Sequence, residues 1–391
     1  MGYDFDEIID RRGTSCIKYD FAKERGLPED VLPMWVADMD FRAPPEVVDA
    51  LTRVAVHGIF GYSESKDEYF APLRDWFARR LGWTPEREWL KKTPGVVYAI
   101  NAALRAFTRR GDAVIVQSPV YYPFFSSVRA NGRLLVDSPL AYGEGGAYTV
   151  DFVDFERKVK EFRPKMFLLC SPHNPVGRVW TDAELDTLAG ICLKHGTLVF
   201  SDEIHCDFAW GGRSHRVLAS LSRETAGSAI LATAPSKTFN LAGLMISNVF
   251  IPDRTLRREF ASEVERTGLS QLSVMGLAAG AAAYRYGEPW LEALKAYLEA
   301  TIAFVRGFVA ERLPGVRLVE PEGTYLLWLD FRALGLPHEE VCRKIVHEAR
   351  LWLDDGLIFG EAGRHFQRIN MAAPLATVKE ALERLERVFF G

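Results

Sequence analysis

The feature that most constrains the fold of this chain is a series of short apolar runs, each ending in turn-forming residues. The runs cover residues 113–117, 134–137, 166–170, 198–201, 229–233 and 247–251. Their length and their content of Val, Ile and Leu predict buried β-strands. Helical patterns separate several runs, and the clearest begins after Thr181, where Glu184 completes a capping box, and ends at Gly196. This alternation predicts an α/β fold in which helices cover both faces of a mainly parallel central sheet.

The pattern changes after about residue 284. The sequence predicts a long amphipathic helix over 289–312, strand character over 316–331, and two helices around a short strand at 367–372. Residues 1–45 hold few periodic stretches and many turn formers, so we expect them to wrap around the body or to contact another subunit. Because 391 residues exceed what one core usually serves, we predict a large domain of residues 46–284 and a small α+β domain of residues 1–45 and 285–391.

Charge and composition narrow the range of partners. The net charge is −4 with both signs interspersed, which leaves no basic stripe for nucleic acid and no polybasic helix for a membrane surface. The most apolar run, 272–283, is shorter than the roughly 18–20 residues that span a bilayer, and the N-terminus lacks the apolar segment of a signal peptide. Five cysteines at irregular spacing contain no C-x-x-C pair and indicate reduced thiols. We therefore expect a cytoplasmic protein that acts on small molecules.

Lys237 follows the apolar run 229–233, within the segment TAPSKTFNLAG. This position puts an amine at the end of a buried strand, where burial lowers the pKa of a lysine and makes it a nucleophile able to form a Schiff base. The alternative is a lysine in a surface loop, which is the commoner place for this residue type. The neighbours of Lys237 decide between the two.

Asp202 ends the run TLVFSD, so its carboxylate emerges at the carboxyl edge of a central strand, where open α/β sheets bind ligands. A cationic partner such as a pyridinium nitrogen would satisfy it. The alternatives are a helix cap or a metal ligand, because Glu203, His205, Cys206 and Asp207 lie nearby. No second cluster of ligands has a recognisable spacing, so we predict no metal.

Further positions suit the binding of a phosphorylated aromatic ring. The backbone N–H groups of Gly95, Val96 and Val97 open a helical pattern, and such a terminus binds phosphate. Tyr121 follows another strand and offers either a ring for stacking or a core aromatic. Asn174 lies in a Pro-flanked turn, where its amide either donates to a phenolate oxygen or shapes the turn. The absence of G-x-G-x-x-G and of a P-loop argues against a nucleotide cofactor.

Arg368 lies in the short apolar run FQRIN of the small domain. An arginine within a strand is costly unless it is paired, and a substrate α-carboxylate gripped bidentately would supply the partner. The alternative is an edge strand from which the side chain points to solvent.

Together, four motifs resemble the fold-type I pyridoxal-phosphate enzymes of the class I/II aminotransferase superfamily. They are N-P-x-G at 174–177, S-D-E-I-H at 201–205, S-K-T-F-N at 236–240 and R-I-N at 368–370. The match spans nearly the whole chain, and the spacings agree. The resemblance implies the three-layer α/β/α PLP-transferase fold with a smaller α+β domain, and pyridoxal 5′-phosphate (PLP) held on Lys237 as a Schiff base.

The same resemblance implies roles for individual residues. The catalytic residues are Lys237, Tyr121 and Asp202. The cofactor-binding residues are Gly95, Val96, Val97, Tyr121, Asn174, Asp202, His205, Thr233, Ser236 and Lys237, with Tyr62 reaching the phosphate of the other subunit across a homodimer interface. The substrate-binding residues are Arg368, Ala37 and Asn174.

Within the superfamily, the segments at 33–41 and 60–63 look most like the cystathionine β-lyase and cysteine-S-conjugate β-lyase branch. His205 stands where transaminases have a Tyr, Tyr121 stands where aspartate aminotransferases have a Trp, and no further arginine stands out as a partner for a dicarboxylate. The chain also departs from the family pattern. Ala234 and Met245 replace a phosphate-binding Ser and Arg, and MAAP at 371–374 replaces Cys-Pro-Arg.

The resemblance implies a PLP-dependent carbon–sulfur β-lyase that converts cystathionine or a related cysteine S-conjugate to a thiol, pyruvate and ammonia. The first alternative is an aminotransferase, which shares the early steps and needs a 2-oxo acid. A second is a regulatory PLP-binding protein without turnover. A dehydrogenase or a metallohydrolase lacks its fingerprint glycines or its ligand set here.

Overall fold

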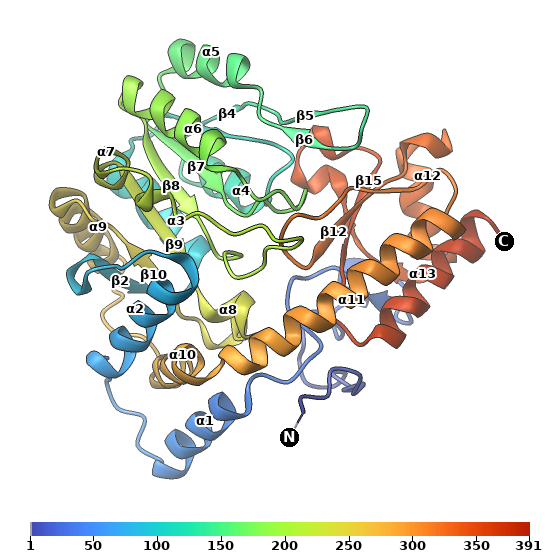
Figure 1. Cartoon of the computed structure of the whole chain (residues 1–391), viewed down its shortest axis with the longest axis horizontal. Coiled ribbons are helices and arrows are strands. Elements are labelled where there is room, and N and C mark those ends of the chain that lie inside the picture. Colours follow the sequence, from blue (N-terminus) through green and yellow to red (C-terminus); the bar gives the residue numbers. More distant parts are fainter. Residues whose placement is uncertain (1) are drawn as a thin grey trace.

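The computed structural model describes residues 2–391 and contains two main β-sheets (Figure 1). The larger sheet has the strand order β2-β10-β9-β8-β7-β3-β4. The strands are β2 (Leu90–Thr93), β3 (Ala113–Val116), β4 (Leu134–Asp137), β7 (Met166–Cys170), β8 (Leu198–Asp202), β9 (Ala229–Thr233) and β10 (Ser247–Phe250). Strands β3, β4, β7, β8 and β9 are parallel, and β10 is antiparallel to its neighbours β9 and β2. The predicted mainly parallel sheet is confirmed. Strand β2 escaped prediction because its sequence, LKKT, is polar.

Helices cover both faces of this sheet, as Figure 1 shows. Successive residues of β3 point to opposite faces: Val114 and Val116 pack into one apolar cluster with helices α3, α4 and α9, while Ile115 packs into a second cluster with α2, α5 and α6. The helices of this part are α1 (Pro45–His57), α2 (Asp67–Leu81), α3 (Val96–Phe107), α4 (Pro123–Ala130), α5 (Phe152–Phe162), α6 (Asp182–His195), α7 (Arg223–Gly227), α8 (Pro235–Thr238), α9 (Arg254–Arg266) and α10 (Val274–Tyr286). Burial on both faces makes the three-layer α/β/α architecture. None of the helices in residues 2–391 is long and apolar enough to span a membrane.

The start of α6 follows the predicted capping box. The Thr181 hydroxyl accepts the backbone N–H of Glu184 at 3.2 Å, and the Glu184 carboxylate accepts the backbone N–H of Thr181 at 2.9 Å. Gly196 ends the helix with φ +67°, a left-handed conformation that favours glycine.

Replacing Thr181 with Ala is expected to lower the free energy of unfolding by about 1 kcal/mol, because the N–H of Glu184 loses its acceptor. Urea denaturation measures this change. Thr187→Ala is the matched control, because the hydroxyl of Thr187 donates only to the carbonyl oxygen of Ala183 in the same helix and caps no helix end. An equal loss of stability in both variants would show that the capping contact is not the cause.

The second sheet is antiparallel and has the order β11-β12-β15-β14. Its strands are β11 (Arg317–Leu318), β12 (Leu326–Asp330), β14 (Asp354–Asp355) and β15 (Phe366–Asn370). The helices of this part of the chain are α11 (Glu288–Arg312), α12 (His338–Arg343) and α13 (Leu375–Phe389). The helix predicted over 289–312 forms α11, and the stretch predicted over 316–331 divides into β11 and β12. We propose that this sheet is the centre of the small domain of residues 1–45 and 285–391.

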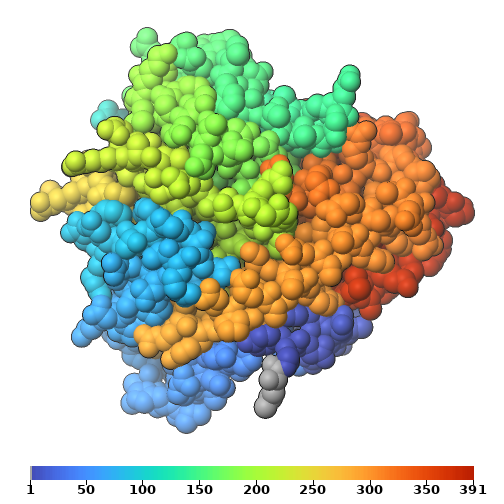
Figure 2. Space-filling view, in the orientation of Figure 1, coloured from blue at the N-terminus to red at the C-terminus, as the bar shows by residue number. Residues whose placement is uncertain are grey.

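The N-terminal segment lies against this second part of the chain. Strand β1 (Leu32–Pro33) pairs in parallel with β13 (Leu351–Trp352), and the rings of Trp35 and Trp352 stack at 4.4 Å. Figure 2 shows the dark-blue N-terminal residues beside the orange and red C-terminal part. Two short strands, β5 (Ala141–Tyr142) and β6 (Tyr148–Thr149), form a separate hairpin.

Candidate active site

The carboxyl edge of the large sheet carries a cavity. Strands β7, β8 and β9 end there at Cys170, Asp202 and Thr233, and the short helix α8 follows β9 directly. Nine of the predicted site residues line the cavity: Ala37, Val96, Val97, Tyr121, Asn174, Asp202, His205, Ser236 and Lys237. Three residues that were not predicted, Cys170, Ile204 and Ala242, complete the lining. The cavity lies where ligands bind in open α/β sheets.

Lys237 projects from α8 into this cavity and is not a surface lysine. Its Nζ donates a hydrogen bond of 2.6 Å to the carbonyl oxygen of Ala37. Burial lowers the pKa of Lys237 to about 8, with a smaller contribution from the positive charge of Arg368, while the negative charges of Asp38 and Asp202 oppose the shift. More of the amine is therefore unprotonated near neutral pH than in an ordinary lysine, and this is the form that acts as a nucleophile.

Asp202 lies in the cavity wall with 3% of its surface exposed. Its Oδ1 accepts the backbone N–H of Ile204 at 3.1 Å. Burial raises the pKa of Asp202 to about 7, and the nearby Glu203 adds to this, although Lys237 and the Ile204 N–H lower it. A buried carboxylate with one hydrogen bond is suited to a cationic ligand that enters the cavity.

The other acidic residues of this segment serve the framework. Glu203 accepts hydrogen bonds from Ser201, from His215 and from the backbone of Leu218. Asp207 accepts hydrogen bonds from Trp76 and Thr238. Both carboxylates thus have hydrogen-bond partners other than Asp202. Within residues 2–391, the segment D-E-I-H-C-D at 202–207 forms no group of three possible metal ligands.

Arg368 lies on β15, inside the second sheet, and is 2% exposed. The alternative of a solvent-facing arginine is therefore wrong. Its Nη1 donates to Oδ1 of Asn174 at 2.9 Å, so the Asn174 side chain joins the cavity wall to the small sheet. Its Nη2 donates to the carbonyl oxygen of Trp35 at 3.0 Å and to the Asp354 carboxylate. The guanidinium also lies over the ring of Phe359, 4.8 Å from its centroid.

Residues 35–41 pass the site, and Ala37, the one of them that the sequence identified, lines the cavity. Tyr325 donates to the Ala37 carbonyl at 3.0 Å, alongside Lys237. Asn240 and Asn370 use their side-chain amides to bind four more carbonyls, those of Met39, Phe41, Val36 and Asp38. Both asparagines belong to the recognised motifs, but their targets lie 199 to 334 residues away in sequence. Local patterns carry no signal for contacts of this kind.

The start of helix α3 brings hydrogen-bond donors without partners to the cavity. Gly95 precedes α3, whose first-turn residues Val96 and Val97 have free backbone N–H groups, and nothing lies within 4 Å of a Cβ built on Gly95. The hydroxyl of Thr233 is buried and has no hydrogen-bond partner among residues 2–391. A helix start with free N–H groups suits a phosphate.

The remaining predicted residues lie as follows. His205 is buried, its Nδ1 has no partner within the described chain, and burial lowers its pKa, which keeps the ring neutral. Ala234 and Met245 bring no polar group to the site. Tyr62 is 97% exposed and does not line the cavity within one chain.

These donors and acceptors fit PLP. The cavity presents an amine for an aldehyde, a carboxylate for a pyridinium nitrogen, and the start of α3 with the Ser236 hydroxyl for a phosphate. The aromatic ring of Tyr121 lines the same space. Thr233 and His205 each have a buried polar atom without a partner, which a ligand of this chemistry would satisfy.

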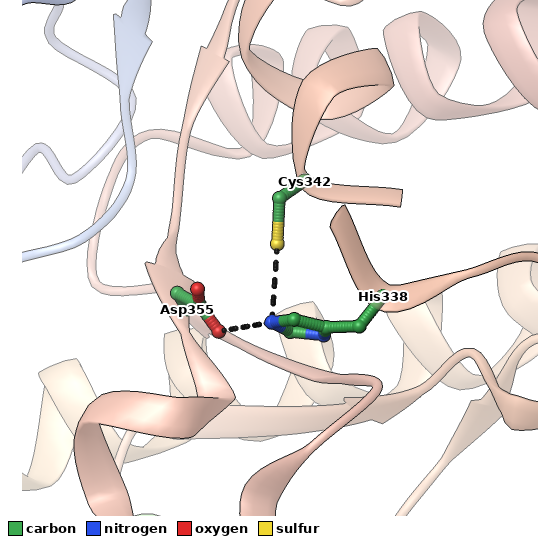
Figure 3. A group of neighbouring side chains, drawn as sticks. All are labelled: His338, Cys342 and Asp355. Atoms are coloured by element: carbon green, nitrogen blue, oxygen red, sulfur yellow. Dashed lines mark hydrogen bonds and ion pairs between the residues drawn. The ribbon is translucent and has the colours of Figure 1, made fainter. Parts of the chain in front are cut away.

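One other group of residues has the chemistry of metal ligands. His338, Cys342 and Asp355 lie together beside the small sheet, as Figure 3 shows. The Nδ1 of His338 accepts the backbone N–H of His365 at 3.1 Å, so its Nε2 carries the ring proton and donates to Asp355 at 3.0 Å. Burial raises the pKa of the Cys342 thiol to about 12. Hydrogen bonds therefore join the three side chains, because His338 Nε2 also lies 3.5 Å from the sulfur of Cys342.

The fold and the site define a known class of protein. The sequence profile of the family described as aminotransferase class I and II matches residues 29–385, and the chain belongs to this family. The predicted family is thereby confirmed.

Individual relatives are similar over almost their entire length. The chain is 41% identical to the cystathionine beta-lyase PatB of Bacillus subtilis, over 98% of both chains. Its structure matches that of cystalysin from Treponema denticola, which contains PLP, with a TM-score of 0.95 and 36% identity over 99% of both chains. It also matches the PLP-bound C-S lyase from Staphylococcus hominis, with a TM-score of 0.93 and 30% identity over 100% of this chain and 99% of that one.

Proposed function

We propose that this chain is a PLP-dependent carbon–sulfur β-lyase that cleaves L-cystathionine or a related cysteine S-conjugate to a thiol, pyruvate and ammonia. The observation that carries the proposal is that Lys237 and Asp202 line one cavity at the sheet edge, while Arg368 holds the lining residue Asn174 by a hydrogen bond. The similarity to a cystathionine beta-lyase and to two lyase structures that contain PLP supports the same activity.

In this proposal, seven side chains and the start of helix α3 would hold the cofactor. Lys237 would bind it covalently, Asp202 would form an ion pair with its ring nitrogen, and Tyr121 would stack on its ring. Asn174 and His205 would serve its phenolate oxygen. The backbone N–H groups of residues 95–97 bind the phosphate, together with the hydroxyls of Thr233 and Ser236. When bound, PLP supplies an electron sink that stabilises negative charge at the substrate Cα.

The chain itself then orients the substrate and moves the proton. Arg368 would bind the substrate α-carboxylate, and protein acceptors already use three of its five N–H donors. Asn174 and Ala37 complete this end of the site. The amine of Lys237 would remove the Cα proton of the substrate, since its pKa of about 8 is close to the ambient pH. Loss of the thiolate from Cβ follows.

We further propose a cytoplasmic homodimer in which Tyr62 reaches the phosphate of the other subunit. The loop before α2 exposes Ile59, Phe60 and Tyr62 at 70%, 61% and 97%. Adjacent exposed apolar side chains of this kind are typical of an interface. All five cysteines are free thiols, as suits a reducing compartment.

Purified, cofactor-loaded protein is expected to release pyruvate and free thiol from L-cystathionine with no 2-oxo acid present. The two products should appear in equal amounts over many turnovers, because elimination regenerates the enzyme in each cycle. A coupled pyruvate assay and a thiol reagent measure them. Product formation that requires a 2-oxo acid, with accumulation of the corresponding amino acid, would instead identify an aminotransferase. Retention of PLP without turnover of any amino acid would favour the regulatory alternative.

A further inference from the structure

The guanidinium of Arg368 is already engaged by protein acceptors. Both N–H groups of Nη2 are used, one by the carbonyl oxygen of Trp35 and one by the carboxylate of Asp354. One N–H group of Nη1 is used by Asn174. The Nε atom is buried and has no partner within residues 2–391.

This arrangement limits how Arg368 can hold a second carboxylate. A carboxylate that binds a guanidinium bidentately uses two parallel N–H groups, either on Nη1 and Nη2 or on Nε and Nη2. Both modes require an N–H of Nη2. A bidentate substrate carboxylate therefore needs one of the two existing acceptors of Nη2 to give way.

Asp354 is the acceptor that can give way. The Trp35 carbonyl belongs to a backbone fixed on either side, because the N–H of Met34 donates to Trp352 and the carbonyl of Val36 accepts from Asn370. Asp354 contributes only a side chain, which can rotate about its χ angles. It stands directly opposite Arg368 in the β14–β15 register, so it is close enough to return when the site is empty.

Charge points the same way. Arg368 and Asp354 are 2% and 6% exposed, and together they form a buried, neutral pair. A substrate carboxylate would place a second negative charge on one guanidinium, and two carboxylates that share a buried site repel each other. Burial already raises the pKa of Asp354, even though the charge of Arg368 opposes the shift.

We propose that Asp354 occupies on Arg368 the position of the substrate α-carboxylate, and that this internal competition sets how weakly amino acids bind. The inference rests on the proposed role of Arg368 as the α-carboxylate site. Asp354 balances the charge of the buried guanidinium in the free enzyme, and it is displaced or neutralised when an amino acid binds.

The test is a titration of the holoenzyme with glycine, which has the α-amino and α-carboxylate groups but no leaving group on Cβ. Binding is followed by the change in cofactor absorbance. Asp354→Asn keeps the shape and removes the charge, and Asp354→Ser is a second variant with a smaller side chain. The matched control is Asp355→Asn, because Asp355 is the next residue of β14 and faces His338 and Cys342 instead (Figure 3). Glycinamide, which lacks the carboxylate, is the ligand control.

Both Asp354 variants are expected to bind glycine about tenfold more tightly than the wild type, since removal of a like charge beside a buried carboxylate site has effects of this size. The glycine affinity of Asp355→Asn should equal that of the wild type. The affinity of the Asp354 variants for glycinamide should also equal that of the wild type. Unchanged or weaker glycine binding in the soluble Asp354 variants would overturn the proposal and leave Asp354 as a support for Arg368. Failure of the wild type to cleave any thioether, with tightened glycine binding in the variants, would refute the lyase assignment alone.

Discussion

Replacing Lys237 with Ala is expected to lower kcat for thiol release by about four orders of magnitude or more. The variant loses both the amine that holds the cofactor covalently and the base that removes the Cα proton, and general-base catalysis alone contributes about 10²–10⁴-fold. Steady-state kinetics with L-cystathionine measure the loss. Mass spectrometry after borohydride reduction should find the cofactor attached to the wild type and absent from the variant.

The control for this experiment is a lysine outside the site. Lys194→Ala removes an exposed lysine whose partner is Glu156 on the protein surface. Its activity should equal that of the wild type, because exposed ion pairs contribute little to stability. Wild-type turnover in Lys237→Ala would mean that the cavity is not the catalytic site.

Replacing Asp202 with Asn is expected to lower kcat by about 10²–10³-fold, the usual effect of removing one preorganised electrostatic contact. The amide cannot form an ion pair with the ring nitrogen, so charge developing at the substrate Cα is less well stabilised. Asp202→Glu keeps the charge and should retain more activity than Asp202→Asn. Equal activity of the asparagine variant and the wild type would remove Asp202 from the mechanism.

Although Asp202→Asn is expected to lower activity, it should make the cofactor-free protein more stable at pH 8. The pKa of Asp202 is raised from 3.8 to about 7 in the folded chain, so the unfolded chain ionises at lower pH than the folded one. The free energy of unfolding of the wild-type protein therefore falls as the pH rises between these two values. The asparagine variant has no carboxyl group at this position and does not show this fall. Thermal melts of both cofactor-free proteins at pH 5 and pH 8 measure the difference. Catalytic carboxylates commonly reduce stability in this way.

The sequence alone predicted the elements whose signals are local. Strand β7 is a continuous apolar run, and α6 begins with a capping box and ends at a glycine, so their bounds followed from periodicity and end signals. Strand β2 was missed because a polar edge strand has no such signal. The motifs around Asn174, Asp202, Lys237 and Arg368 also indicated the family and the fold class, and the comparisons confirm both.

Only the tertiary structure decided how these residues meet. The contact of Arg368 with Asp354 depends on the register of β14 and β15, and the contact of Lys237 with Ala37 joins residues 200 positions apart. The shifted pKa values of Lys237 and Asp202 arise from burial among elements distant in sequence. A sequence determines which side chains carry the chemistry and which short segments hold them, because those signals are local. Pairing, burial and charge balance depend on the packing of the whole chain, and so they appeared only in the folded molecule.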